Sequence, residues 1–227
     1  TLTEYTIWLY HFNTVEMSFS SPAIATAVTG GTLSSTSPTT NAPAPTCPAA
    51  DVVSVYGSHY PTNIATNYNP NWGQTGSVNP NFDPGTGNPV LAYTNFNYQG
   101  TQLTQTNLSS MEFLTFDIWT DADPSATTIQ VSPINIGGVT EVLVTVPFVQ
   151  GQWTTIELPK VAFTGMTWNA IHQLKFAANG PGSAVPVDIY LDNIYFSTCG
   201  TPIPVITGDI YINDGAFAPG DFCTAAG

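Results

Sequence analysis

The clearest pattern along the chain is an alternation of apolar and polar positions within short segments. In the segment MEFLTFDIWT, Leu114, Phe116 and Ile118 share one parity, whereas Asp117 has the other. Successive side chains of a β-strand point to opposite faces, so this alternation predicts a strand with one buried face. No segment sustains a period of 3.6 residues, although residues 166–174 are compatible with one helical turn.

Short segments of this kind recur through the middle of the chain. They are DVVSVYG, NPVLAYTNFNYQG, MEFLTFDIWT, TTIQVSPIN, TEVLVTVPF, WTTIELP, HQLKFAAN and DIYLDNIYFS. Residues that favour turns, namely Gly, Pro, Asn and Asp, separate them. Many short strands at this spacing predict an all-β fold, an antiparallel β-sandwich or jelly roll.

The flanking segments differ from this middle part. Residues 1–37 open with TLTEYTIWLYHF, which predicts a strand, either the end of a preceding module or a strand that docks onto the main domain. Residues 38–50 are rich in Pro, Thr and Ala and read as a stiff linker. We therefore expect the sandwich at residues 51–198, followed by a C-terminal tail or the start of a further module at 199–227.

Charge narrows the range of ligands. The chain has 15 acidic residues, two lysines and no arginine, with a formal net charge of −13. Nucleic acids and anionic membranes bind through clusters of Lys and Arg, so both are excluded as partners. No run of 18 apolar residues exists, so no membrane span is expected. A neutral ligand remains the natural partner.

Catalytic patterns are missing from the sequence. The three histidines are isolated, and no nucleophile-elbow, zinc-protease or phosphate-loop motif occurs. Glycoside hydrolysis needs two carboxyl groups that face one sugar, yet Glu112 and Asp117 have opposite parity on one strand. Nothing in the sequence brings Glu141 and Glu157 together. We therefore expect the chain not to be an enzyme.

Three cysteines allow one disulfide and leave one thiol. Cys47 and Cys199 flank the predicted sandwich, so a bridge between them would tie its two ends together. A bridge between Cys199 and Cys223 is the alternative. No Cys or His spacing is typical of zinc.

Acidic residues at the two ends of the predicted sandwich suggest a metal. Asp51 opens the domain, and Asp192 lies on its last strand beside Asn193. Carboxylate and carbonyl oxygens suit Ca²⁺, so we expect a structural calcium ion near Asp51 and Asp192. Alternatively, Asp192 and Asn193 form a strand cap or a bulge.

Seven short motifs follow one another between about residues 45 and 198, and their order carries a resemblance to a known family. They are PAADVVSVYGSHYPTN, NPNWGQT, YTNFNYQG, LTFDIWTDAD, WTTIELPKVAFTGM, IHQLKF and VDIYLDNIYF. In these the chain resembles a family of non-catalytic β-sandwich modules attached to secreted bacterial polysaccharide-degrading enzymes. The resemblance implies a jelly-roll module similar to carbohydrate-binding modules, secretion, and neighbouring modules in the same chain. A neutral polysaccharide is the implied ligand.

The loop NPNWGQTGSVNP places Trp72 among residues that favour turns. Aromatic rings pack against the C–H faces of sugars, and amides bond their hydroxyls. We therefore expect Trp72, Gln74, Tyr98 and Gln99 to form the ligand-binding site. In the alternative, Trp72 is a lid on the core and the chain is a structural or adhesive repeat of a long extracellular protein.

Two more tryptophans are candidates for this role. Trp119 and Trp153 either line a concave sheet face or close one end of the core, and we favour a structural role for both. Trp168 is expected to pack within a loop.

Overall fold

The computed structural model describes residues 36–60, 62–179 and 186–200 in full, together with the backbone of four strands nearer the N-terminus. β1 (Thr3–Leu9) pairs antiparallel with β4 (Ala23–Thr29), and β2 (Phe12–Asn13) pairs with β3 (Ser18–Phe19). From residue 201 on, the predicted C-terminal tail or further module lies outside the described residues, as does Cys223.

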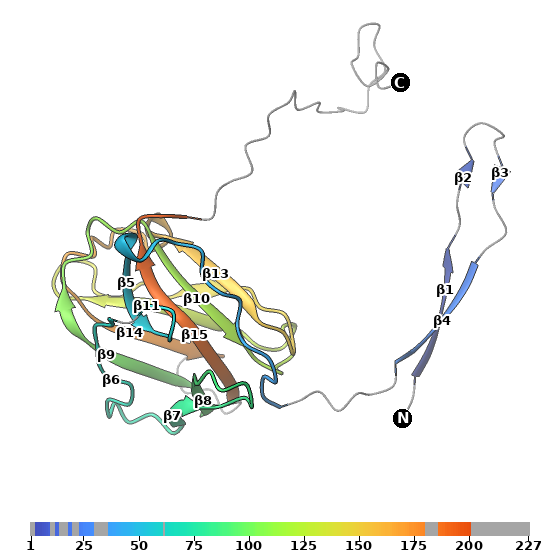
Figure 1. Cartoon of the computed structure of the whole chain (residues 1–227), viewed down its shortest axis with the longest axis horizontal. Coiled ribbons are helices and arrows are strands. Elements are labelled where there is room, and N and C mark those ends of the chain that lie inside the picture. The colour runs from blue at the N-terminus through green and yellow to red at the C-terminus, as the bar shows by residue number, and fades with distance from the viewer. Residues whose placement is uncertain are drawn as a thin grey trace, which may run out of the picture.

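Two antiparallel sheets make up the main domain (Figure 1). The first, here called the strap sheet, has the order β13-β10-β15-β8-β7, and β5 pairs with the end of β15. Its strands are β5 (Val52–Tyr56), β7 (Ser77–Phe82), β8 (Val90–Phe96), β10 (Phe113–Trp119), β13 (Thr154–Pro159) and β15 (Val187–Ser197).

The second sheet, here called the loop sheet, has the order β12-β11-β14-β9-β6. Its strands are β6 (Ala65–Asn67), β9 (Tyr98–Thr106), β11 (Ile129–Asn135), β12 (Val144–Val146) and β14 (Ile171–Ala178). The predicted all-β sandwich is confirmed. The described helices are two short 3₁₀ turns, η1 (Ala49–Asp51) and η2 (Lys160–Ala162), and no described helix is long and apolar enough to cross a membrane.

The core lies between the two sheets, where their inward positions meet. Leu114, Phe116 and Ile118 of β10 are each fully buried there, as the alternation predicted. Phe176 of the opposite sheet meets Phe116 edge to face, with ring centroids 5.2 Å apart. Burying a side chain of this size contributes about 1.5–3 kcal/mol, so the two facing layers hold the sandwich together.

The helical turn expected within residues 166–174 does not form. Residues from Ile171 onward belong to β14, and Trp168 has a φ of +57°, which no helix contains. Trp168 is instead fully buried in the core against Phe163 and Phe196, as expected for a packing residue.

The segment 36–48, here called the strap, runs along the outer face of the strap sheet before the chain enters η1 and β5 (Figure 1). A disulfide joins Cys47 near the end of the strap to Cys199, just beyond β15, with their Cα atoms 6.1 Å apart. Of the two pairings that the sequence allowed, the structure therefore has the one that closes the ends of the sandwich.

Candidate functional site

Trp72 lies on the outer face of the loop sheet, over β9. Its six-membered ring occupies the space that a Cβ at Gly100 would need. The indole is partly exposed, so it is neither buried in the core nor free of the protein. Glycine is required beneath it because no larger residue leaves room for the ring. Trp72 therefore covers a sheet surface, and not the sandwich core.

The loop around Trp72 is held by its own side chains. The side-chain oxygen of Gln74 accepts the backbone N–H of Trp72 at 2.6 Å, and its amide nitrogen donates to the carbonyl of Pro70 at 2.8 Å and to Asn69 at 3.1 Å. Asn71 accepts the N–H of Gly73 at 3.2 Å. These bonds fix a short loop that lacks a strand partner, so the indole is positioned before any ligand arrives.

Tyr98 supports the loop from the sheet. Its hydroxyl donates to the carbonyl of Trp72 at 2.9 Å, and its ring is partly exposed on β9. The predicted proximity of Trp72 and Tyr98 is thus present in the structure. The hydroxyl of Tyr98 is engaged in holding the loop, which makes Tyr98 a support for the indole.

Gln74 and Gln99, the two amides predicted to bind the ligand, do not point to the outer face beside Trp72. Gln99 is 1% exposed and faces inward, where its amide nitrogen donates to the carbonyl of Gly100. Parity explains this placement, because Tyr98 and Gly100 face outward on β9 and the residue between them must face the core. The Gln74 amide forms its hydrogen bonds within its own loop. Neither amide is placed as a contact for a ligand on the outer face.

Other polar side chains occupy that face beside the indole. Gln102 lies two residues beyond Gly100 on β9, and Gln173 is its cross-strand partner on β14. The amide of Gln173 donates to Gln102 at 2.8 Å, and Gln102 donates to the carbonyl of His172 at 3.1 Å. Sequence reasoning missed this pair, although the outward parity of Gln102 in YQGTQLTQT was visible.

Charge at this face is balanced. Lys175, the cross-strand neighbour of Gly100, pairs with Glu141 at 2.6 Å. The other lysine, Lys160, pairs with Glu112 at 3.1 Å near η2. The chain has no arginine, so these two lysines are its only Lys or Arg residues, and a carboxylate pairs with each of them. The face therefore suits a neutral polar ligand better than an anionic one.

The outer face of the strap sheet is acidic under its cover. Asp117 is 3% exposed and accepts hydrogen bonds from Thr155 and from the Asn193 amide, the latter at 2.8 Å. Burial raises the pKa of the Asp117 carboxyl to about 6. Burial also raises the pKa of Asp192, which accepts a hydrogen bond from Asn88 at 3.0 Å. Both shifts arise from desolvation of the charged form.

The two expected calcium ligands lie far apart. The carbonyl of Asp51 accepts the N–H of Thr198, just beyond the end of β15. Asp192 lies six residues before Thr198 along β15, and six residues of a strand span about 20 Å. One ion cannot take both carboxylates. Among the described residues, no group of three or more His, Cys, Asp or Glu side chains is arranged for a metal. A structural calcium ion stays a prediction without an assigned site.

Asn193 instead forms the bulge that the sequence allowed as an alternative. Its φ is +48°, and around this position β15 shifts register against β10 and against β5. Asn tolerates this left-handed conformation better than most residues. Gly57 passes so close that a Cβ there would lie 3.1 Å from the Asn193 nitrogen. The bulge turns the Asn193 side chain toward Asp117 and the strap.

Trp119 and Trp153 belong to an apolar cluster on the outer face of the strap sheet. Trp119 and Tyr190 are each 4% exposed, and their ring centroids lie 5.6 Å apart. Trp153 packs against this cluster, and its indole N–H donates to the carbonyl of Thr40 in the strap at 2.8 Å. Both tryptophans thus line a sheet face, which was one of the two positions considered for them.

These features define a β-sandwich module with a fixed aromatic loop on one sheet and a covered aromatic face on the other. No family model matches the chain, and no curated protein matches it. Solved structures that are similar include a family 11 carbohydrate-binding module from Clostridium thermocellum in complex with a β-1,3-1,4-mixed-linked tetrasaccharide. Its TM-score is 0.40, at 17% identity over 65% of this chain and 94% of that one.

Two further structures show the same kind of similarity. A family 30 carbohydrate-binding module has a TM-score of 0.41, at 17% identity over 74% of this chain and 93% of that one. A variant of a family 29 carbohydrate-binding module has a TM-score of 0.40, at 14% identity over 67% and 97%. At these identities the likeness concerns the fold.

Proposed function

We propose that this chain is a secreted, non-catalytic module that binds a neutral polysaccharide on the outer face of its loop sheet. Trp72 is the stacking residue, and the amides of Gln102 and Gln173 bond sugar hydroxyls. The observation that carries the proposal is the seat of the Trp72 ring on Gly100, because it fixes a partly exposed indole beside a polar sheet surface.

The chemistry of the face fits a sugar. A pyranose ring offers a C–H face to an aromatic plane and hydroxyls at its rim. A primary amide has two N–H donors and an oxygen with two lone pairs, so the bonds between Gln102, Gln173 and His172 use only part of their capacity. The balanced pair of Lys175 and Glu141 adds polar contacts without a net charge.

The site is organised in advance. Gln74 and Tyr98 hold the main chain of Trp72, so stacking requires no ordering of the loop. Rigid aromatic residues contribute much contact area at a low cost in conformational entropy. The disulfide between Cys47 and Cys199 supports a location outside the cytoplasm, where such bridges persist.

A panel of neutral glucans, xylans and mannans, soluble and insoluble, tests the proposal. We expect the chain to be retained by at least one of them and Trp72→Ala to lose that retention. The control is Val161→Ala, which removes an exposed apolar side chain from η2, far from the loop in sequence. Absence of binding across the panel, or binding that ignores Trp72, refutes the proposed site.

A further inference from the structure

The strap is held on its sheet through its backbone carbonyls. Four side chains donate to them: Tyr190 to Thr36 at 3.3 Å, Trp153 to Thr40 at 2.8 Å, Asn193 to Pro43 at 3.0 Å and Tyr60 to Cys47 at 2.7 Å. These donors are side chains of the domain, so the strap does not join the sheet as an added strand. Side-chain donors and aromatic rings that hold an extended, proline-rich segment resemble a groove with its ligand.

The surface beneath the strap has the composition of a binding face. Trp119 and Tyr190 project from the solvent side of the sheet, where Phe82 meets Tyr190 with centroids 4.9 Å apart. Trp119 and Tyr190 are nevertheless almost fully buried, and Pro38 is buried too. Pro38 lies between the two strap carbonyls bound by Tyr190 and Trp153. An apolar cluster on the outside of a sheet needs a cover, and the strap supplies it.

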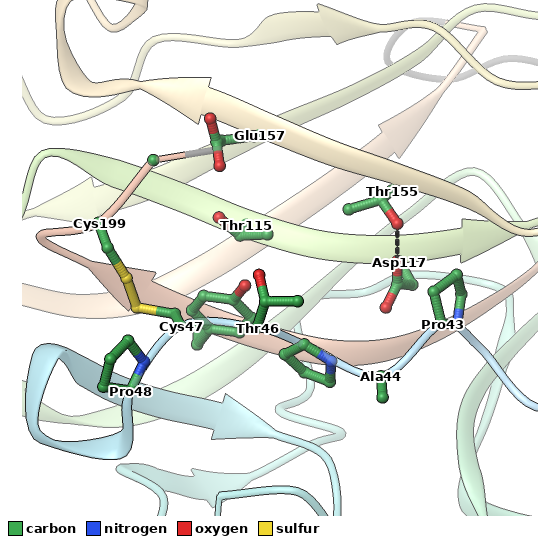
Figure 2. A pocket seen from close by; sticks show the side chains of 13 residues that line it. Pro43, Ala44, Thr46, Cys47, Pro48, Thr115, Asp117, Thr155, Glu157 and Cys199 are labelled. Atoms are coloured by element: carbon green, nitrogen blue, oxygen red, sulfur yellow. Dashed lines mark hydrogen bonds between the residues drawn. A yellow bond between two sulfur atoms is a disulfide. The ribbon is translucent and has the colours of Figure 1, made fainter. Parts of the chain in front are cut away.

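Beside this cluster, the strap borders a cavity of about 680 Å³ whose lining is mixed, with apolar strap residues and polar sheet residues. Strap residues 43–48 form one wall, and side chains from β10, β13 and β15 form the other (Figure 2). The sheet side contributes Thr115, Asp117, Thr155, Glu157 and Tyr195. This volume is in the range of ligand pockets.

The position of the acidic groups fits a hydroxyl-rich ligand. Thr115 pairs with Glu157 and Asp117 with Thr155 across β10 and β13, so both carboxylates lie on one face in a diagonal relationship. Figure 2 shows Asp117 beside Pro43 of the strap, with Thr155 hydrogen-bonded to it. Carboxylates accept from hydroxyls, and the donors that now bind strap carbonyls are equally able to bind sugar oxygens.

We propose that the strap is an autoinhibitory cover over a second glycan-binding face, formed by the Trp119–Tyr190 cluster and the adjoining cavity with its Asp117 and Glu157 carboxylates. The Cys47–Cys199 disulfide keeps the strap in place. Reduction by a dithiol, which is itself oxidised to a disulfide while Cys47 and Cys199 become thiols, frees the strap and opens the face to a neutral polysaccharide chain. The proposal shares the ligand class of the proposed function and rests on it for that class alone, because the face lies on the other sheet from Trp72.

The experiment separates the two sites by variant. Binding of soluble mixed-linked β-glucan and of xyloglucan is measured by titration calorimetry on full-length chains that carry Trp72→Ala. One chain keeps the strap and the disulfide; the other also carries Cys47→Ser, Pro38→Gly and Pro43→Gly, which loosen the strap without changing the sheet face. Pro124→Gly, in an exposed turn, serves as the proline control.

The loosened chain is expected to bind at least tenfold more tightly than the closed one, and a further Trp119→Ala change is expected to abolish the gain. Equal glycan binding by both chains overturns the proposal, as does a loosened chain that binds a synthetic peptide of residues 36–48 but neither glycan. Should the multiple variant not fold, the Trp72→Ala chain with and without dithiothreitol gives the same comparison. If the wild-type protein shows no glycan binding that depends on Trp72, the proposed function is refuted. That result leaves the present inference standing.

Discussion

The ring of Trp72 takes the place of a side chain at Gly100, so the loop and the sheet are fitted to each other at a single residue. This contact shows that Trp72 is not a lid on the core. The indole covers the outer face of β9 and remains partly exposed, while Phe176 and its neighbours fill the core without it.

Gly100→Ala is expected to lift Trp72 from the sheet. Overpacking of this kind typically costs about 1–3 kcal/mol, which appears as a lower free energy of unfolding in urea. On a Trp72→Ala background the same substitution is expected to cost much less, because the ring with which the new methyl collides is gone. Equal costs on both backgrounds contradict the contact. Near-ultraviolet circular dichroism reports the changed indole environment in the single variant.

Gln74→Ala is expected to loosen the loop and leave the sandwich intact. The loop loses three hydrogen bonds, so the Trp72 amide should exchange its proton faster by at least tenfold. Glycan affinity should fall several-fold, since the loop must then be ordered on binding at about 0.5–1.5 kcal/mol per side chain. The unfolding midpoint should change little. Unchanged amide exchange speaks against preorganisation by Gln74.

Removal of the disulfide by Cys47→Ser is expected to lower stability substantially. The bridge closes a loop with a sequence separation of 152 residues, and the chain-entropy treatment gives about 5 kcal/mol for such a loop. Urea unfolding of wild type and variant measures the difference. Cys223→Ser is the control and should leave stability unchanged; a large loss in that variant would reveal a bridge between Cys199 and Cys223.

Stability should depend on the ionisation of Asp117. Its pKa is about 6 in the folded protein and 3.8 as an ordinary carboxyl, so the folded state holds the proton more tightly. The contribution is complete below about pH 4 and is lost as pH rises through 6, for at most about 3 kcal/mol. Asp117→Asn, which keeps the shape, should remove this dependence. The difference between wild type and variant is measured by urea unfolding at several pH values, and a constant difference contradicts the assignment.

The strands were predictable because their apolar alternation is local. Leu114, Phe116 and Ile118 reveal their face without any knowledge of partners, and the outward position of Gly100 and Gln102 follows from the same rule. Strand pairing is not local. The meeting of Asp117 and Glu157 in one cavity depends on the register of β10 with β13, which alternation alone does not set.

The binding residues were predictable only in part for the same reason. Trp72 and Tyr98 meet as expected, whereas Gln99 falls on the inward parity of β9 and Gln74 is taken up by its own loop. The linker composition of residues 38–50 indicated an extended segment, but its carbonyl contacts with Trp153 and Asn193 come from residues more than 100 positions away. The calcium site was predicted near Asp51 and Asp192 because the sequence places them on the first and last strands of the domain. Asp51 lies beside the end of β15, whereas Asp192 lies near its middle.

Titration calorimetry of wild type and Trp72→Ala, with the glycan that the panel selects, tests the central claim most directly. The account predicts that Trp72→Ala weakens binding at least tenfold, about 1.4 kcal/mol or more, with an unchanged unfolding midpoint. Trp72→Phe, which keeps a smaller ring, should fall between the two. Equal affinity of wild type and Trp72→Ala for every glycan that binds would contradict it.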